Sequence, residues 1–364
     1  MNRWILLAGG MFMLSACTQE NESTTNNSED DGMTQESGPD TTMDMTTLAD
    51  QLKAPWAIVK GEEVFFVPRR DGTIYVINEN GTVSEQPVYL EEDVEQEAES
   101  GLLGMVLHPE FEENQTAFLY HSYESNEGIE NRIIETRWDE ENEEWNEVDV
   151  LLDGIPGAGI HNGGRLAIGP DQLLYATTGD ADQEELAQDV DNLAGSILRM
   201  ELDGAIPSDN PFENSVVYSY GHRNPQGLAW VEDGTMFSSE HGPVGHDEIN
   251  VIEPGSNYGW PEITGDETRD GMMPPLIHSG EDTWAPSGLT ADKDQLYVAG
   301  LRGEAIYQFA PDDENLVELI DGVGRIRDVH VEDGVLYFIT NNTDGRGTPS
   351  EEDDQLIKWE LNKL

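Results

Sequence analysis

The 364-residue sequence has little cysteine and no long apolar segment. Cys17 is its single cysteine, so no disulfide can form within the chain and the rest of it lacks thiol chemistry. Its N-terminal apolar run, Trp4–Met13, is too short to span a bilayer stably. A disulfide-stapled fold and a transmembrane helix at this end are both excluded.

Basic residues are also scarce. The chain has 18 Lys and Arg against 75 Asp and Glu, which gives a formal net charge of −57. Nucleic acid and anionic lipid surfaces repel such a chain, and we interpret the charge as an acidic surface that stays hydrated. Five arginines nevertheless lie in glycine-rich or turn-like motifs, which suggests a site for an anion with several carboxylates or phosphates, with structural ion pairing as the alternative: Arg165, Arg223, Arg302, Arg325 and Arg327.

The first 50 residues read as export and tether segments. Residues 1–17 have the layout of a lipoprotein signal peptide, with Arg3, an apolar core and the sequence LSAC ending at Cys17. This end matches a bacterial lipobox, whereas a chance cysteine in an ordinary signal peptide is the alternative. Residues 18–50 lack Lys and Arg, are rich in polar and acidic residues, and predict a disordered acidic tether. We therefore expect an exported protein, anchored by lipid on Cys17 to the periplasmic or cell-surface side of a bacterial membrane.

Residues 51–364 are long enough for one large domain and indicate an all-β fold. A loose repeat of a turn, a short apolar run with an aromatic residue and then polar residues recurs every forty to sixty residues or so, as blades of four strands require. It begins at Val64, Thr116, Asp171, Asp233, Asp294 and Asp333. Six units predict a six-bladed β-propeller, with a pair of β-sandwiches as the alternative.

The segment from His161 to Ala181 carries the first candidate for chemistry. His161 precedes a pair of glycines, which bury nothing but let a backbone approach a flat ligand closely. Asp180 follows nineteen residues later and can return beside His161 if one strand and one turn separate them. An imidazole oriented by a carboxylate is the arrangement of a general base.

Four further motifs accompany this segment. They are ESGLLGMVLHPEF from Glu99, YSYGHRNPQGLAW from Tyr218, SEHGPVGHDEINVIEPGSNYGWP from Ser239, and the late arginine motifs LRGEAIYQF and GRIRDV. Together the motifs resemble the soluble quinoprotein aldose sugar dehydrogenases, the glucose/sorbosone dehydrogenase-like family. The resemblance covers most of the chain from about Ala54 and implies a six-bladed propeller that uses pyrroloquinoline quinone (PQQ) and calcium.

The resemblance assigns roles to residues of this chain. His161 corresponds to the general base, Asp180 to its orienting partner, and Arg223 to a residue beside the quinone carbonyl. The cofactor-binding positions are Glu99, Arg223, Asn224, Arg302, Arg325 and Arg327. Two of them depart from the pattern, because Glu99 stands where glutamine is common and Arg302 where some members have lysine.

Two calcium sites are also implied. Gly242 and Pro243 resemble a pair whose backbone carbonyls hold the calcium next to PQQ. Asp247, Glu248 and Tyr258 match a second, structural calcium site, with solvated acidic surface as the alternative for the two acids. The loop is not an ideal match, because Val244 and His246 replace the more usual residues.

The implied function is oxidation of aldose sugars at C1 to lactones. His161 would assist hydride transfer to the quinone, and the electrons would pass to a respiratory or artificial acceptor. Two other functions remain open. A calcium-dependent, lactonase-like propeller hydrolase would use the metal loop without a quinone, and a non-catalytic binding propeller would show no turnover.

Overall fold

The computed structural model describes residues 45–311 and 315–361. The predicted signal peptide, Cys17 and residues 18–44 of the predicted tether lie outside the described residues. Helical structure in the described part is confined to a short α-helix, α1 (Phe111–Asn114), and one 3-10 turn, η2 (Glu184–Gln188). Within the same residues, no helix has the length and apolar character needed to cross a membrane.

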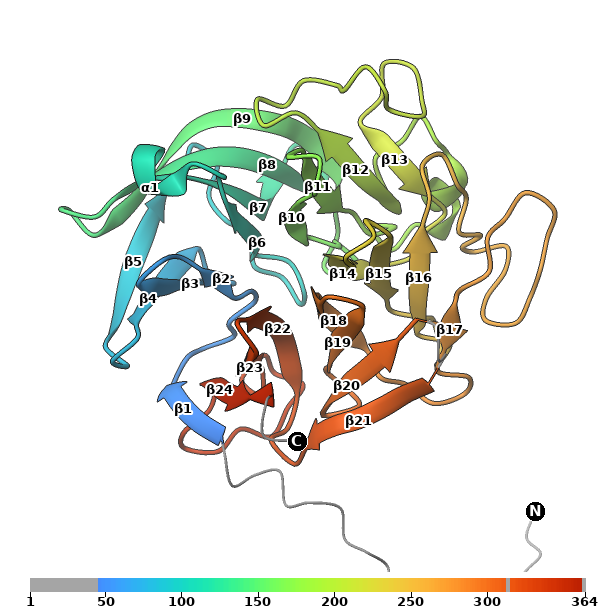
Figure 1. Ribbon diagram of the computed structural model, residues 1–364. Helices are drawn as coiled ribbons and strands as arrows, with labels where there is room; N and C mark the ends of the chain where they lie inside the picture. Colours follow the sequence, from blue (N-terminus) through green and yellow to red (C-terminus); the bar gives the residue numbers. More distant parts are fainter. Residues whose placement is uncertain (1–44, 312–314, 362–364) are drawn as a thin grey trace, which may run out of the picture. The chain divides into compact units, whose positions relative to one another are not determined.

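Six antiparallel sheets of four strands follow one another around a common centre (Figure 1), as the sequence predicted. From the innermost strand outwards, the first three are β2 (Val59–Lys60), β3 (Val64–Arg69), β4 (Thr73–Asn78), β5 (Val83–Tyr89); β6 (Leu102–Leu107), β7 (Thr116–Ser125), β8 (Gly128–Asp139), β9 (Glu144–Pro156); and β10 (Leu166–Ile168), β11 (Leu174–Thr177), β12 (Ser196–Met200), β13 (Val217–Tyr220). The outer strands β5 and β9 pair in parallel and join the first two blades into one eight-stranded sheet.

The remaining three blades complete the ring. They are β14 (Pro225–Trp230), β15 (Met236–Glu240), β16 (Glu248–Ile252), β17 (Ile277–His278); β18 (Pro286–Asp292), β19 (Gln295–Gly300), β20 (Ala305–Ala310), β21 (Asn315–Asp321); and β22 (Ile326–Glu332), β23 (Val335–Thr340), β24 (Leu356–Glu360), β1 (Met45–Ala49). The fold is therefore the six-bladed propeller and not a pair of sandwiches.

The last blade combines both ends of the described chain. β1 pairs with β24, Met45 lying opposite Trp359 and Ala49 opposite Leu356. This pairing corrects the predicted tether, which extended to residue 50, because residues 45–49 form the outer strand of the last blade. Adding β1 to β24 completes the sixth blade and ties it to the start of the domain.

The sequence repeat corresponds to the second strand of every blade. The six repeats contain β3, β7, β11, β15, β19 and β23. Each of these strands lies inside its sheet and packs on both faces against neighbouring blades, so it consists mostly of buried residues. This is why the second strand carries the most recognisable hydrophobic pattern.

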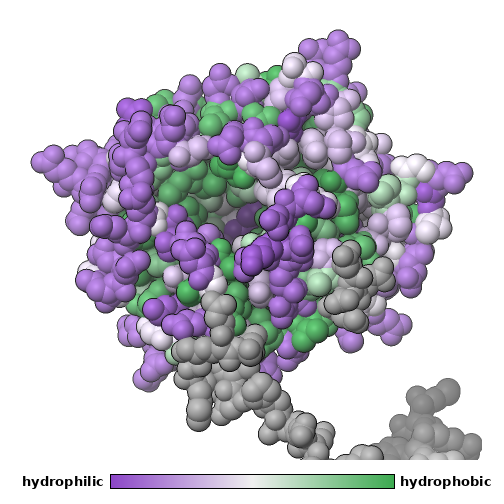
Figure 2. Space-filling view, in the orientation of Figure 1, coloured by the Kyte–Doolittle hydropathy of each residue, from purple (hydrophilic) through white to green (hydrophobic). Residues whose placement is uncertain are grey.

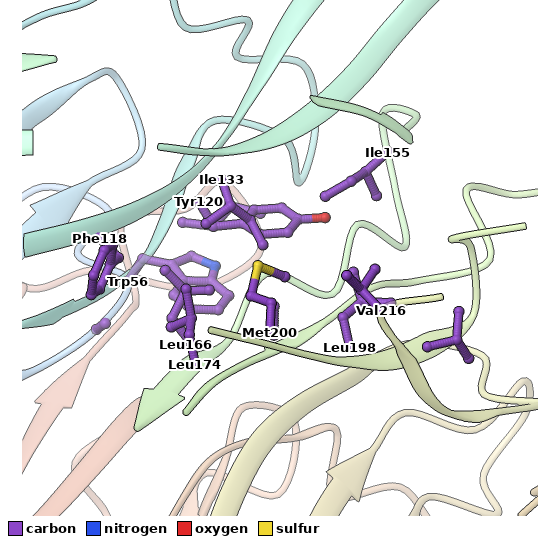
Figure 3. Packing of buried hydrophobic residues seen from close by; sticks show 14 residues of the cluster. Trp56, Phe118, Tyr120, Ile133, Ile155, Leu166, Leu174, Leu198, Met200 and Val216 are labelled. Carbon is purple, nitrogen blue, oxygen red and sulfur yellow. The ribbon is translucent and has the colours of Figure 1, made fainter. Parts of the chain in front are cut away.

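The hydrophobic core lies between the blades, whereas hydrophilic residues predominate around the outer rim of the face seen in Figure 2. The cluster in Figure 3 joins residues of the second and third blades, among them Phe118, Tyr120, Leu174 and Met200, and Trp56 packs beside Leu166. The hydroxyl of Tyr120 donates to the carbonyl of Asn162 at 2.9 Å, which fixes the residue that follows His161. The core therefore reaches directly to the segment that carries the predicted base.

A buried ion pair stands at the centre of the ring. Arg165 Nη1 lies 3.0 Å from Asp328 Oδ2, which also accepts from the N–H of Ile58 at 2.7 Å, and Arg165 Nε donates to the carbonyl of Gln226. The guanidinium lies over the Trp56 ring, 4.5 Å from its centroid. For Arg165 the structure therefore favours the structural alternative, a charge that links several blades.

Candidate active site

The topology gathers the predicted site residues at one end of the propeller. In a four-stranded antiparallel blade, the connection into the first strand and the one from the second to the third strand lie at the same end. Connections into the innermost strands carry Glu99, His161, Arg223 and Arg325, and Asp180 follows the second strand β11. Loops from several blades therefore build one site, as is usual for a propeller.

His161 and Asp180 form the predicted pair. His161 Nδ1 lies 2.8 Å from Asp180 Oδ1, and the side chains are 13% and 2% exposed. Because a carboxylate can only accept, this bond places the proton on Nδ1 and leaves Nε2 of His161 as the acceptor. The geometry is that of an oriented imidazole able to take a proton.

Close backbone packing brings the two residues together. His161 has a positive φ of 57°, and its carbonyl accepts from the N–H of Ala181 at 3.2 Å. A Cβ on Gly179 would overlap this carbonyl oxygen, so only glycine fits there. The N–H of Asp180 donates to the carbonyl of Arg223 at 2.8 Å, which ties the pair to the next blade.

Trp260 connects the pair to Arg223. Its indole N–H donates to Asp180 Oδ2 at 2.8 Å, and the Arg223 guanidinium lies over the Trp260 ring, 5.4 Å from its centroid. Trp260 arrives on the long connection between β16 and β17, which bridges to β13 through Tyr220 and Asn257. No pattern in the sequence points to this contact, because Trp260 lies within a Tyr-Gly-Trp-Pro run that is typical of a structural turn.

Arg223 and Asn224 lie on the connection into β14. The N–H of Arg223 donates to the Glu240 carboxylate, and its guanidinium donates to the carbonyl of His241 at 3.3 Å. Asn224 Oδ1 accepts from the N–H of Gly163 at 3.0 Å, whereas its buried Nδ2 has no protein partner. The buried Nε2 of His241 also has none. Unpartnered buried polar atoms are costly, so these two are candidate ligand contacts.

A cavity lies beside these groups. Its polar lining includes three arginines, Arg70, Arg327 and Arg346, and two acids, Glu99 and Asp344. Burial, together with the neighbouring Arg325 and Arg70, lowers the pKa of Arg327 to about 9. An anion bound here would favour the charged guanidinium, so the cavity suits a ligand with carboxylates.

The other three arginines predicted to bind the cofactor do not line this cavity, and Arg223 lies instead at the second cavity described below. Arg325 is buried and bound on several sides, with Nη2 2.9 Å from Asp344 Oδ2 and Nε 3.2 Å from the carbonyl of Asn341. Arg302 is exposed on the connection between β19 and β20. The sequence missed Arg70 and Arg346. Their only signal was position, since both lie in turn sequences, PRRDG and TDGRG, like those that singled out the others.

Glu99 lies at the rim of the cavity. Its Oε2 accepts from the N–H of His161 at 3.2 Å, and its Oε1 lies 2.5 Å from Arg346 Nη1. Burial alone would raise the pKa of Glu99, but Arg346 and the His161 N–H outweigh it and lower the pKa to about 2. Glu99 is therefore a charged acceptor and not the neutral donor that a glutamine would provide.

Four of the five predicted calcium residues line a second cavity: Gly242, Pro243, Glu248 and Tyr258. Asp247 does not line it. Its Oδ2 accepts from the N–H groups of Trp284 and Ala285 and from the Thr283 hydroxyl, and its Oδ1 accepts from the N–H of Gly242. Asp247 therefore organises the loop around Gly242, and only its Oδ1 keeps a lone pair for a further contact.

Glu248 offers a better fit to a cation. It lies opposite Glu240 in the β15–β16 pairing, and burial and the Glu240 carboxylate raise the pKa of Glu248 to about 8. The buried Oδ1 of Asn250 beside them has no donor. Hard oxygens with excess negative charge suit calcium. The Tyr258 hydroxyl donates to the carbonyl of Val251, so only the backbone of Tyr258 is free to contribute. Across the described residues, no cluster of three or more His, Cys, Asp or Glu forms a metal site.

The fold and the site together define a class: a six-bladed propeller with an oriented histidine beside an arginine-lined cavity. The model of the family "Glucose / Sorbosone dehydrogenase" matches residues 52–356. The chain belongs to this family of oxidoreductases, as its motifs predicted.

Its relatives agree with this assignment. Quinoprotein glucose dehydrogenase B of Acinetobacter calcoaceticus is 34% identical over 255 residues, 61% of this chain but only 53% of that protein. Aldose sugar dehydrogenase YliI of Escherichia coli is 28% identical and aligns over 84% of this chain and 91% of its own length. The PQQ-bound aldose sugar dehydrogenase of Streptomyces coelicolor has a TM-score of 0.82 and 36% identity, covering 86% of this chain and 96% of that one.

Proposed function

We propose that this chain oxidises aldose sugars at C1 to lactones, with PQQ as the acceptor and calcium as its metal partner. The observation that carries the proposal is the His161–Asp180 pair next to a cavity lined by arginines, in a chain otherwise strongly acidic. The Streptomyces relative has been seen with PQQ bound, which supports the same cofactor here.

The residues of the chain divide the work. His161 Nε2 takes the proton of the C1 hydroxyl, and Asp180 stabilises the imidazolium that forms. Arg223 supplies positive charge next to the reacting atoms, held there by Trp260 and the His241 carbonyl. PQQ, a flat quinone with three carboxylates, supplies the hydride acceptor when bound. The lactone leaves and hydrolyses in water.

Binding of the cofactor and the metal falls to the two cavities. Arg327 and His241 line the arginine-lined cavity and offer a guanidinium and an unpartnered buried ring nitrogen to an anionic, flat ligand. Asn224, whose carbonyl accepts from the N–H of His241, carries a second unpartnered buried group. The carbonyls of Gly242 and Pro243 would hold the calcium beside it, where it acts as a Lewis acid. Glu248 and the Tyr258 backbone would hold a second, structural calcium.

Reconstitution tests the proposal. The metal-free protein is mixed with PQQ and calcium, and reduction of a dye is followed after addition of D-glucose or another aldose. Sugar-dependent reduction is expected in the wild type and lost in His161→Ala. His108→Ala, which changes a histidine in a turn of the second blade, should keep it. Absent reduction, or full activity in His161→Ala, contradicts the proposal.

The same assay separates the two other functions. A lactonase-like hydrolase would open lactones with calcium alone and would not need Arg327. A binding propeller would show no turnover with any sugar, with or without PQQ. The oriented His161–Asp180 pair favours an enzyme over the binding propeller.

We also propose export and lipid attachment at Cys17, on the basis of the LSAC motif alone. In a bacterial host, labelled fatty acid should enter the wild-type protein but not Cys17→Ser. Equal labelling of both would contradict the proposal.

A further inference from the structure

Glu99 places a negative charge where an anionic cofactor is expected. Its backbone is fixed, because its N–H donates to the carbonyl of Gly159 at 2.7 Å and Arg70 binds the carbonyls of Ala98 and Ser100 on either side. The backbone of Glu99 is therefore held beside the cavity, and its side chain is tied there by the N–H of His161 and by Arg346. A fixed carboxylate beside a carboxylate ligand is repulsive unless a cation compensates it.

Arg346 is this cation, although it lies far from Glu99 in the sequence. It lies on the connection between β23 and β24, and its Nη1 contacts Glu99 Oε1 across 247 residues of chain. The backbone N–H of Arg346 donates to Asp344 Oδ1 at 2.9 Å, and Asp344 is itself held by Arg325. The pair thus joins the connection into β6 to the connection between β23 and β24.

The pair also lines the cavity rather than lying outside it. Both residues contribute to its wall, with Glu99 21% and Arg346 53% exposed. The remaining charged lining is Arg70 and Arg327 against Asp344, an excess of one positive charge. Without Arg346, two acids would face two arginines and that excess would vanish.

We propose that Arg346 is the counter-ion of Glu99 at this rim, and that the pair allows a polycarboxylate to bind beside a carboxylate that stays charged. The inference rests on the proposed function, since it assigns to PQQ a recognition residue outside the positions predicted from the sequence. Arg346 is a positioning and charge-compensating residue here, not a catalytic one.

A double-mutant cycle tests the inference. The dissociation constant of PQQ, with calcium present, is measured by quenching of tryptophan fluorescence for wild type, Arg346→Gln, Glu99→Gln and the double variant. Arg346→Gln should bind about tenfold more weakly, because it leaves the Glu99 charge uncompensated. Glu99→Gln should bind at least as tightly as wild type, and the double variant should return to within about threefold of it.

Two results would overturn the inference. Unchanged affinity in Arg346→Gln excludes a role for Arg346, and an equal loss in both backgrounds means that it binds the ligand directly instead of compensating Glu99. Arg269→Gln is the matched control, because Arg269 forms an ion pair with Glu262, is 55% exposed and lines neither cavity. Thermal melting of each cofactor-free variant verifies the fold.

A second probe separates this inference from the proposed function. The cycle is repeated with trimesate, a flat benzene tricarboxylate without a quinone. If wild type binds trimesate with the same pattern but not PQQ, the proposed function fails and the inference stands. If it binds PQQ without the pattern, only the inference fails. Binding of neither overturns both.

Discussion

The two walls of the candidate active site are organised in different ways. The base wall, His161, Asp180 and Trp260, is joined by direct hydrogen bonds of 2.8 Å and needs no ligand to be complete. The arginine wall consists of Arg70, Arg327, Arg346 and Asp344, and with Glu99 included the charged lining keeps an excess of one positive charge. The base wall is arranged to accept a proton, and the arginine wall is arranged to bind an anion.

This difference has a physical origin. A general base works only in one orientation, so the fold fixes it before the substrate arrives. A site for a carboxylate must instead keep positive charge available. Burial of neighbouring guanidinium groups disfavours their charged form, as the lowered pKa of Arg327 shows. Variants of the two walls should accordingly affect different measurable quantities.

The largest effect is expected from Asp180→Asn on the base wall. The neutral amide cannot stabilise the imidazolium and does not impose the Nδ1 tautomer, so kcat for sugar oxidation should fall at least about a hundredfold. PQQ affinity should change little, because Asp180 does not line the cavity. Asp182→Asn, at an exposed neighbouring residue, is the control. An unchanged kcat in Asp180→Asn would show that the base wall takes no part in the chemical step.

The arginine wall should respond in affinity. Arg327→Gln removes the buried guanidinium and should weaken PQQ binding at least about tenfold, measured by fluorescence quenching. Arg302→Gln should bind within about threefold of wild type, because Arg302 is exposed and does not line the cavity. The reverse order would mean that the observed lining does not identify the anion site.

Features formed by residues close in sequence could be predicted, whereas features formed by distant residues could not. The six blades could be predicted because each second strand is buried on both faces and therefore repeats a hydrophobic pattern. The His161–Asp180 pair could be predicted because the two residues are close in sequence, although the hairpin of β10 and β11 separates them and not the single strand that was expected. Two antiparallel strands return the chain to the end of the propeller from which it started, so Asp180 lies beside His161. The strand Met45–Ala49 could not, since its partner β24 lies at the other end of the chain.

The contacts that the sequence missed are long-range as well. Trp260 reaches Asp180 across 80 residues, and Arg346 reaches Glu99 across 247. Arg302, Arg325 and Arg327 share similar motifs, yet only Arg327 lines the cavity, because Asp344 holds Arg325 and the Arg302 side chain is exposed. A motif predicts that an arginine is present but not which acid the fold places beside it.

A further prediction concerns how the stability of the segment that carries Asp344 and Arg346 depends on pH. Buried Asp354 accepts from Asn342 and Thr343, at the start of the segment that carries Asp344 and Arg346. Burial raises its pKa to about 6 from an ordinary value near 3.8. A raised pKa means that the folded protein favours the protonated acid. This contribution to stability is complete below pH 3.8 and is lost as the pH rises through 6.

The free energy of unfolding should therefore carry a term that falls by roughly 2–3 kcal/mol between pH 4 and pH 7, measured by urea denaturation. Asp354→Asn should abolish this dependence on pH, even if the stability of the variant at pH 4 differs from that of the wild type. Asp353→Asn is the matched control of opposite sign. Burial alone would raise the pKa of Asp353, but hydrogen bonds from Ser350 and Asn342 lower it, so this carboxylate stabilises the protein above its ordinary pKa. If the free energies of unfolding of wild type and Asp354→Asn depend on pH in the same way, ionisation of Asp354 does not destabilise the fold. The segment that carries Asp344 and Arg346 then loses no stability through Asp354 as the pH rises.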